Sequence, residues 1–385
     1  MEQILFDQLD SASQSGGPKA AIERLISNLQ EQKQLHELFD ARMLARKFEL
    51  GLPLSRPSSL QDVPEEKRKD VEKTYVEAAR ETGEAFLAQG DIQNGWMYLQ
   101  VIREPEKVAK ALDQLPDNID DYERLEGLLQ IALYQGVNPI KGVKWMLKAH
   151  GTCSTITALD QALSQMSQEY RNACAKLMVR HLHEELTESV RRHVEQRIPM
   201  LPPGQSLAEL IQGRDWLFEG GNYHIDVSHL NSVVRFARSI EAPAEELKLA
   251  ADLAEYGRHL DPQFQYDAEP PFDEFYPAHI QFFNVLLDRN REEGLQYFRD
   301  KLEAEPDEQD KPLLAYVLVD LLIRSEHLDE AVDLSAKYLA NLGEDVSISF
   351  EELCVKAGRL DTLKQVRKEQ GNAVGYVAAM LHGKS

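Results

Sequence analysis

Two stretches decide the fold: AFLAQGDIQNGWMYL at residues 85–99 and ALYQGVNPIKGVKWML at residues 132–147. Both read as an apolar helix, a Gln-Gly pair, a polar turn, and then a glycine and Trp-Met that open a second helix. A glycine just past a helix supplies the left-handed C-cap, which suits Gly90 and Gly136. Because the turn is short, it returns the chain antiparallel to the first helix. Each stretch therefore predicts a helical hairpin.

Helical periodicity also dominates the rest of the chain. Between Val227 and Ile240 the apolar residues recur at spacings of three and four, which places them on one face of a helix. Residues 313–322 and 328–342 read as two more helices around a polar break, and residues 353–366 repeat the helix, glycine, helix theme. Strict alternation is confined to VSISF at residues 346–350, which we interpret as a helix start. One hairpin cannot bury its apolar face alone, so neighbours must stack. We predict an all-α fold, an α-solenoid of stacked antiparallel helical hairpins.

Residues 85–99, together with LLIRSEHLDEAVDLSAKYL at residues 321–339, resemble the tetratricopeptide-like helical-repeat superfamily. The resemblance covers about half of the chain. It places the small residue Ala331 where one helix crosses another closely. It also implies a concave surface that binds a partner.

Proline-rich segments interrupt the helices and set the predicted domains. Residues 52–64 (LPLSRPSSLQDVP) read as a loop or linker. Residues 198–206 (IPMLPPGQS) follow a long helical tract that breaks near Ser167, and we interpret them as the main boundary. We therefore expect two helical-repeat lobes, residues 1–197 and residues 207–385, with an acidic, aromatic loop at residues 261–277 of the second lobe.

Composition excludes several classes of function. The 385 residues carry a formal net charge of -22, which argues against binding a nucleic-acid backbone or an anionic membrane surface. No apolar run approaches the ~18 residues of a membrane span, and no basic segment of the kind found in secretory signals stands near Met1. Three cysteines are too few for a disulfide framework, so we expect a cytoplasmic protein. Neither a glycine-rich phosphate loop nor a GxSxG elbow is present.

The first candidate for chemistry is the turn His150-Gly151-Thr152-Cys153. Gly151 suits the C-cap of the helix that ends at His150, and Ser154 or Thr155 can cap the next helix. Cys153 would then lie at a helix N-terminus, which favours the thiolate. The alternative is a structural turn, with a histidine that is favourable at a helix C-terminus and a small buried cysteine.

The second candidate is YHIDVSH at residues 223–229, which contains Tyr223, His224, Asp226 and His229. Asp226 suits the N-cap of the following helix, and two histidines with a carboxylate can bind zinc or act as general acid and base. A structural role for these residues is the alternative. By contrast, His181, His183 and His193 fall in a charged helix and are expected on a solvated face.

Alternate turns of a hairpin array collect on one edge, so the two candidate turns can form one site. His150, Cys153, His224 and His229 would supply zinc ligands with an open position. Equally, Cys153, a histidine and Asp226 would supply a nucleophile, a base and an orienting group, with Tyr223 nearby.

The third candidate is the aromatic loop. Between Asp261 and Asp310 there are fourteen acidic and four basic residues. Aromatic anchors in acidic surroundings suit a basic or apolar peptide. We predict partner contacts by five aromatic residues, which are Phe264, Tyr266, Phe272, Phe275 and Tyr276. The alternative is a loop folded back on the array with its rings buried.

The leading hypothesis is a cytoplasmic binding module that takes a peptide or protein segment, basic or apolar, on a concave face, with no resident cofactor. The alternative is an enzyme of the hydrolase or lyase type with a zinc or Cys-His site at residues 150–153 and 223–229. The sequence leaves the oligomeric state open.

Overall fold

The structure, a computed structural model, describes residues 2–198, 200–266, 268–340 and 347–382. Pro199, Asp267 and Val346, which belong to segments discussed above, lie outside these ranges. Every regular element within them is helical, which confirms the all-α prediction. None of the helices in these ranges is long and apolar enough to cross a membrane.

The contacts divide the chain into two units, Met1–Ala158 and Leu159–Ser385, and each is described by itself. The first unit contains α1 (Glu2–Glu31), α2 (Leu35–Glu49), α3 (Glu65–Ala88), α4 (Ile92–Leu99), α5 (Pro105–Asp113), α6 (Tyr122–Leu129) and most of α7 (Pro139–Ala162). The second contains α8 (Gln168–Arg197), α9 (Leu207–Ile211), α10 (Val227–Phe236), α11 (Glu246–Arg258), α12 (Phe275–Leu286), α13 (Arg291–Ala304), α14 (Lys311–Arg324), α15 (Leu328–Leu334), α16 (Phe350–Lys356), α17 (Leu360–Glu369) and α18 (Ala373–His382).

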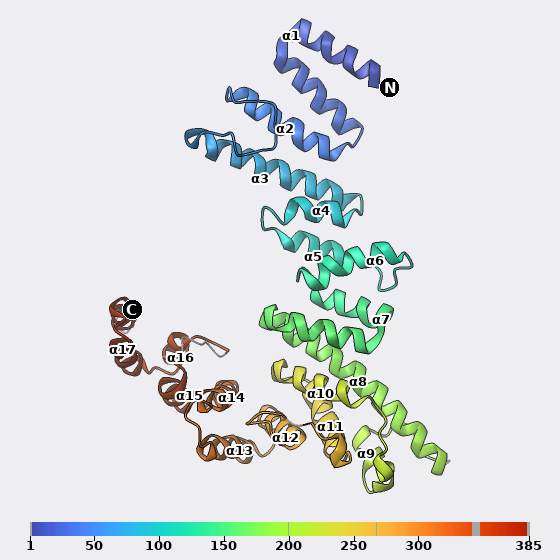
Figure 1. Ribbon diagram of the computed structural model, residues 1–385, viewed down its shortest axis with the longest axis vertical. Coiled ribbons are helices and arrows are strands. Elements are labelled where there is room, and N and C mark those ends of the chain that lie inside the picture. The colour runs from blue at the N-terminus through green and yellow to red at the C-terminus, as the bar shows by residue number, and fades with distance from the viewer. Residues whose placement is uncertain (1, 199, 267, 341–346, 383–385) are drawn as a thin grey trace. The chain divides into compact units, whose positions relative to one another are not determined.

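In the first unit each helix from α1 to α5 packs against the next, as α2, α3 and α4 show (Figure 1). The glycines of the repeated pattern explain how these helices end and pack closely. Gly90 and Gly136 both have positive φ angles, 78° and 70°, so they end their helices as the sequence predicts. The second glycine of the first pattern, Gly95, lies at a helix crossing, because a Cβ added there would stand 3.2 Å from the carbonyl oxygen of Gly83 in α3. The quoted motif therefore encodes both the turn and the close packing of α3 on α4.

The loop at residues 52–64 is attached to the first unit by a buried lysine. Lys47 of α2 donates from Nζ to the carbonyl oxygens of Arg56 and Ser59, both at 2.6 Å. Leu52 and Val63 at the two ends of the loop are buried in the same core as Phe39 and Met43 of α2. This segment is therefore a packed loop between α2 and α3.

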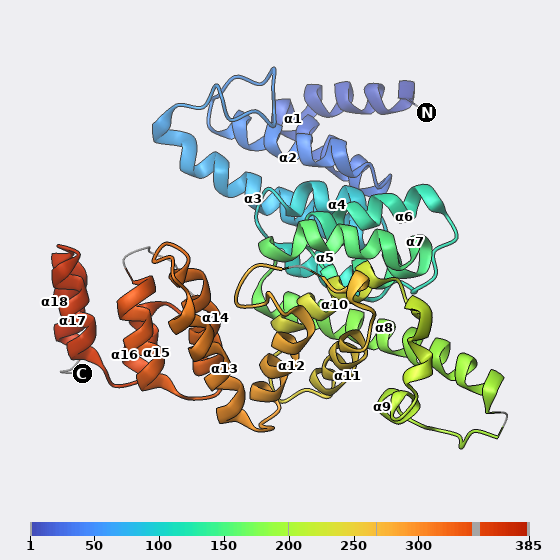
Figure 2. The ribbon, with the colours of Figure 1, turned by 60° about the horizontal axis from the view of Figure 1, so that its bottom comes forward.

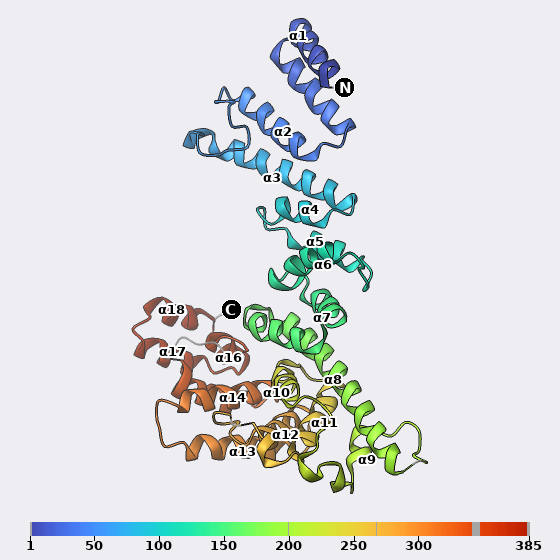
Figure 3. The same cartoon turned by 45° about the vertical axis from the view of Figure 1, so that its right-hand side comes forward.

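The second unit is built around α8, which packs against α9, α10 and α11. From α11 to α14, each helix packs on the next, as Figure 2 shows, and α17 packs beside α18 (Figure 3). The break near Ser167 is confirmed, since Ser167 caps the start of α8. Ala331 of α15 is fully buried.

The expected boundary at residues 198–206 lies inside the second unit, and the division between the units falls within α7 instead. The physical reason is that this segment only connects two packed helices, α8 and α9. Arg191 of α8 also donates to the carbonyl oxygen of Gln205 at 2.8 Å, which holds the segment against α8. Proline content marked a loop here, but the packing on both sides makes it an internal loop of one unit.

Candidate functional site

One face of α8 and the segment 216–229 border a large hollow of the second unit, with a volume of about 1090 Å³. We call it the histidine hollow. Six residues of α8 line it, and their spacing of three, four and seven places them on one helix face; these are Glu185, Ser189, Arg192, His193, Gln196 and Arg197. Opposite them lie Trp216, Glu219, Tyr223, His224, Asp226 and His229.

The position of the 223–229 turn follows from its helix cap. The Asp226 carboxylate accepts hydrogen bonds from the backbone N–H groups of Ser228, at 2.8 Å, and of His229, at 3.3 Å. This confirms the predicted N-cap of α10. These bonds and the Ser228 hydroxyl lower the pKa of Asp226. The carboxylate therefore stays charged in its capping role.

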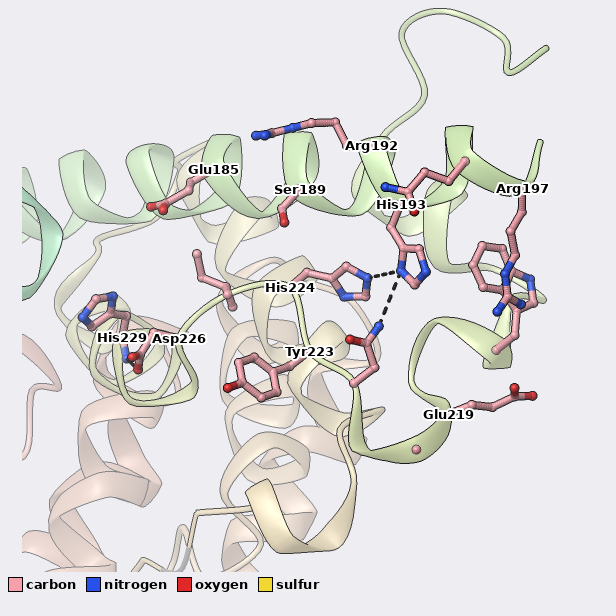
Figure 4. A pocket seen from close by; sticks show the side chains of 15 residues that line it. Glu185, Ser189, Arg192, His193, Arg197, Glu219, Tyr223, His224, Asp226 and His229 are labelled. Carbon is pink, nitrogen blue, oxygen red and sulfur yellow. Dashed lines mark hydrogen bonds between the residues drawn. The ribbon is translucent and has the colours of Figure 1, made fainter. Parts of the chain in front are cut away.

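His224 lies between two neighbours from different helices. Its Nε2 is 2.8 Å from Nδ1 of His193 on α8, and its Nδ1 is 2.9 Å from the hydroxyl of Tyr256 on α11. The backbone N–H of His224 also donates to the Tyr256 hydroxyl oxygen at 2.9 Å. Figure 4 shows His193 and His224 in the middle of the hollow, between Asp226 and His229 at one end and Arg197 and Glu219 at the other.

The following proton arrangement satisfies all of these contacts, in which each ring nitrogen donates or accepts according to the tautomer. Because the Tyr256 oxygen accepts the backbone N–H, its own proton is available to Nδ1 of His224. A neutral His224 then carries its proton on Nε2 and donates it to His193. Burial, with a contribution from His193, lowers the pKa of His224 to about 4, so the neutral form prevails at neutral pH. The arrangement is a Tyr256–His224–His193 hydrogen-bond chain that ends at the hollow.

His193 is the residue that sequence reasoning missed. The expectation of a solvated face is wrong for it, because its ring is half-buried, bonds to His224 and packs edge-on against Trp216 at 5.2 Å between ring centroids. The guanidinium of Arg197 lies over the same tryptophan at 4.3 Å. The shared helix face with Glu185, Ser189 and Arg197 was the available signal.

The turn at His150–Cys153 belongs to the first unit. Gly151 has a φ angle of 77°, which confirms that it ends the helix segment before it. His150 Nε2 lies 2.9 Å from a carboxylate oxygen of Glu126, and Cys153 is exposed. Since the other histidine turn belongs to the second unit, a site shared by the two turns stays a prediction.

The aromatic residues expected to bind a partner divide into two groups. Phe272, Phe275 and Tyr276 are buried, and Phe272 and Phe275 pack on the ring of His279 at 4.4 and 4.3 Å. They belong to the core. Phe264 and Tyr266 are less buried and, together with Phe275, line a smaller hollow of about 360 Å³, and Phe264 contacts Tyr223 at 5.1 Å. The loop therefore folds back on the 223–229 turn.

The described residues contain no group of three or more histidine, cysteine, aspartate or glutamate side chains placed to hold a metal ion. Both ring nitrogens of His224 are engaged in the hydrogen-bond chain.

Comparison with known proteins adds no assignment. No protein-family model matches the chain, and neither a curated protein nor a solved structure is significantly similar to it.

Proposed function

We propose that this chain is a tetratricopeptide-like helical-repeat binding module, in which stacked helical hairpins form a solenoid and present a concave face to a segment of a partner protein. Helices that pack in series, with glycines at the turns and crossings, support this architecture. The histidine hollow is the binding groove of the second unit, and its ligand is an extended segment with basic and apolar side chains.

The observation that carries the proposal is a partly exposed aromatic surface along the histidine hollow and the smaller hollow beside it. Trp216 and Tyr223 line the histidine hollow, and Phe264 and Tyr266 continue the aromatic surface beyond Tyr223. Tyr223 and Tyr266 are 50% and 49% exposed. Aromatic side chains with exposed faces are frequent anchors of protein interfaces.

Charge indicates what these aromatic residues bind. Three carboxylates, those of Glu185, Glu219 and Asp226, line the histidine hollow against two guanidinium groups, those of Arg192 and Arg197. Trp216 already stacks on one guanidinium, that of Arg197. An arginine of a partner would find the exposed ring of Tyr223 and nearby carboxylates, which is the arrangement that favours cation–π contacts.

The test is fluorescence polarisation with two labelled peptides of equal length, one alternating arginine and leucine and the other alternating glutamate and leucine. We expect the basic peptide to bind more tightly, and Trp216→Ala or Tyr223→Ala to weaken it about tenfold, as loss of an interface anchor does. Tyr134→Ala, which removes an exposed tyrosine of the first unit, is the matched control and should bind as the unchanged protein does. Equal binding of both peptides, or no effect of either groove variant, would refute the proposal.

One observation favours the alternative function, an enzyme of the hydrolase or lyase type. The Tyr256–His224–His193 chain ends at an open hollow, where a histidine can exchange protons with a substrate. The zinc version of this alternative is tested by metal analysis of the purified protein and of the Cys153→Ala and His224→Ala variants. Zinc that is lost in both variants would establish a site shared by the two turns and would replace the binding-module proposal.

A further inference from the structure

A second large hollow in the second unit has a different character from the histidine hollow. Its volume is about 780 Å³, and the start of α8, the turn after α10 and the end of α14 bound it. Five basic side chains line it against three acidic ones. The basic ones are Arg171, Arg235, Arg238, Arg324 and Lys356, and the acidic ones are Glu241, Asp320 and Glu326. We call it the arginine hollow. Its lining carries an excess of positive charge, although the whole chain has a net charge of -22.

Carboxylates already neutralise three of the five basic groups. Arg324 pairs with Asp320 at 3.0 Å, and Lys356 pairs with Glu326 at 3.1 Å. Arg235 pairs with Asp160 at 2.6 Å. These three ion pairs leave two basic groups of the hollow, Arg171 and Arg238, without a carboxylate partner among the described residues.

Arg238 and Arg171 make no ion pair with any described residue. The Arg238 guanidinium lies over the ring of Phe272 at 4.6 Å, and its Nε donates to the carbonyl oxygen of Arg235 at 3.4 Å. Burial and the charge of Arg235 lower the pKa of Arg238 to about 10, against a smaller opposing contribution from the Asp320 carboxylate. Arg171 donates to uncharged oxygens, the Gln168 side chain and the Met166 carbonyl.

A half-buried guanidinium that forms no ion pair loses solvation without a contacting charge to compensate for it. A ligand anion would supply that charge. Guanidinium groups match the geometry of phosphate oxygens and form short, charge-assisted hydrogen bonds with them. Tyr316 and Ile323 also line this hollow and offer apolar surface beside the charges.

We infer that the arginine hollow binds a phosphate monoester, with Arg238 and Arg171 donating to the phosphate oxygens and the organic part lying against Tyr316 and Ile323. This inference goes beyond the proposed peptide groove and shares no residue with it. The two proposals therefore fail independently.

Isothermal titration calorimetry with O-phospho-L-serine tests the inference, and L-serine is the ligand control. We expect binding of the phosphorylated compound only, weakened about tenfold by Arg238→Gln and by Arg171→Gln, because each removes charge-assisted hydrogen bonds. Arg289→Gln is the matched control, since it removes one exposed arginine outside the hollow and should leave binding unchanged. Circular dichroism establishes that each variant is folded, and Arg171→Gln keeps the test decisive if Arg238→Gln unfolds.

The same titration with a short phosphoserine peptide and with inorganic phosphate identifies the source of the phosphate group. A tighter complex with the peptide supports a phosphorylated protein segment, and a tighter complex with the free compounds supports a small metabolite. An unmodified protein that binds none of them, or folded Arg238→Gln and Arg171→Gln variants that bind like Arg289→Gln, overturns the inference.

Discussion

The two histidine-bearing turns look alike in the sequence but differ in their surroundings. At residues 150–153, one helix segment ends at a glycine, His150 meets a single carboxylate, and Cys153 is exposed. At residues 223–229, His224 is held by side chains from two other helices, and the turn borders a large hollow.

The difference lies in the number of elements that pack around each turn. His150 contacts groups from one neighbouring helix, α6, through Glu126 and the ring of Tyr122. His224 lies against α8 and α11, and these helices remove solvent from its ring. Residue type alone therefore does not distinguish a surface turn from a buried polar network, whereas the partners that packing supplies do.

The largest expected effect tests the buried end of that network. Tyr256→Phe removes the hydroxyl that accepts the backbone N–H of His224 and bonds to its Nδ1. We expect a loss of about 2–3 kcal/mol in the free energy of unfolding, because buried polar groups are left without partners. Urea denaturation measures the loss. Tyr122→Phe, at the exposed tyrosine beside His150, should change the same quantity by less than about 0.5 kcal/mol. Equal losses would contradict the comparison.

The next effect is a dependence of stability on pH. The pKa of His224 is about 4 in the folded protein, below its ordinary value of 6.5, so the unfolded chain takes up a proton first as the pH falls. The stabilisation is complete above about pH 6.5 and is lost as the pH falls towards 4. Between pH 7 and pH 4.5 this amounts to about 2 kcal/mol.

The variant His224→Gln measures this contribution. Its loss of unfolding free energy between pH 7 and pH 4.5 should be smaller than that of the unchanged protein by about 2 kcal/mol. His279, whose pKa burial lowers to about 3, contributes in the same direction in both proteins, so the difference isolates His224. If the unfolding free energies of the two proteins fall in parallel with pH, the pKa of His224 is not lowered by burial in the folded protein.

A smaller effect concerns the helix caps. Asp226→Ala should cost about 1–2 kcal/mol of unfolding free energy, because the carboxylate accepts two backbone N–H groups at the start of α10. Asp121→Ala in the first unit removes a cap that accepts one, from Arg124 at 3.0 Å, and should cost about 0.5–1 kcal/mol. Urea denaturation of both variants measures the two losses of unfolding free energy. A larger loss for Asp121→Ala than for Asp226→Ala would contradict the expected order.

Local sequence signals predicted the helices and their ends. The apolar stripe of α10, the Asp226 cap, the helix break near Ser167 and the turn glycines Gly90 and Gly136 all depend on neighbours within a few residues. The hydrogen-bond chain of the site could not be predicted in this way. His193 and Tyr256 stand 31 and 32 residues from His224, and only the packing of α8 and α11 brings them together. The same long-range packing buries Phe272, Phe275 and Tyr276, whose local sequence resembles an exposed acidic loop.

The smallest effect on stability belongs to Cys153. Because this thiol is exposed at a turn, Cys153→Ala should change the free energy of unfolding by less than about 0.5 kcal/mol. The same substitution should have a large effect on the thiol reactivity of the protein. The thiolate is the reacting form, and burial raises the pKa of Cys174 to about 12 and that of Cys354 to about 11, so these two cysteines react slowly. Titration of the folded protein with a thiol-specific chromogenic disulfide should therefore show one fast-reacting thiol, and none in Cys153→Ala. A variant that loses several kcal/mol, or that keeps the fast reaction, would show that the turn at 150–153 is as closely packed as the turn at 223–229.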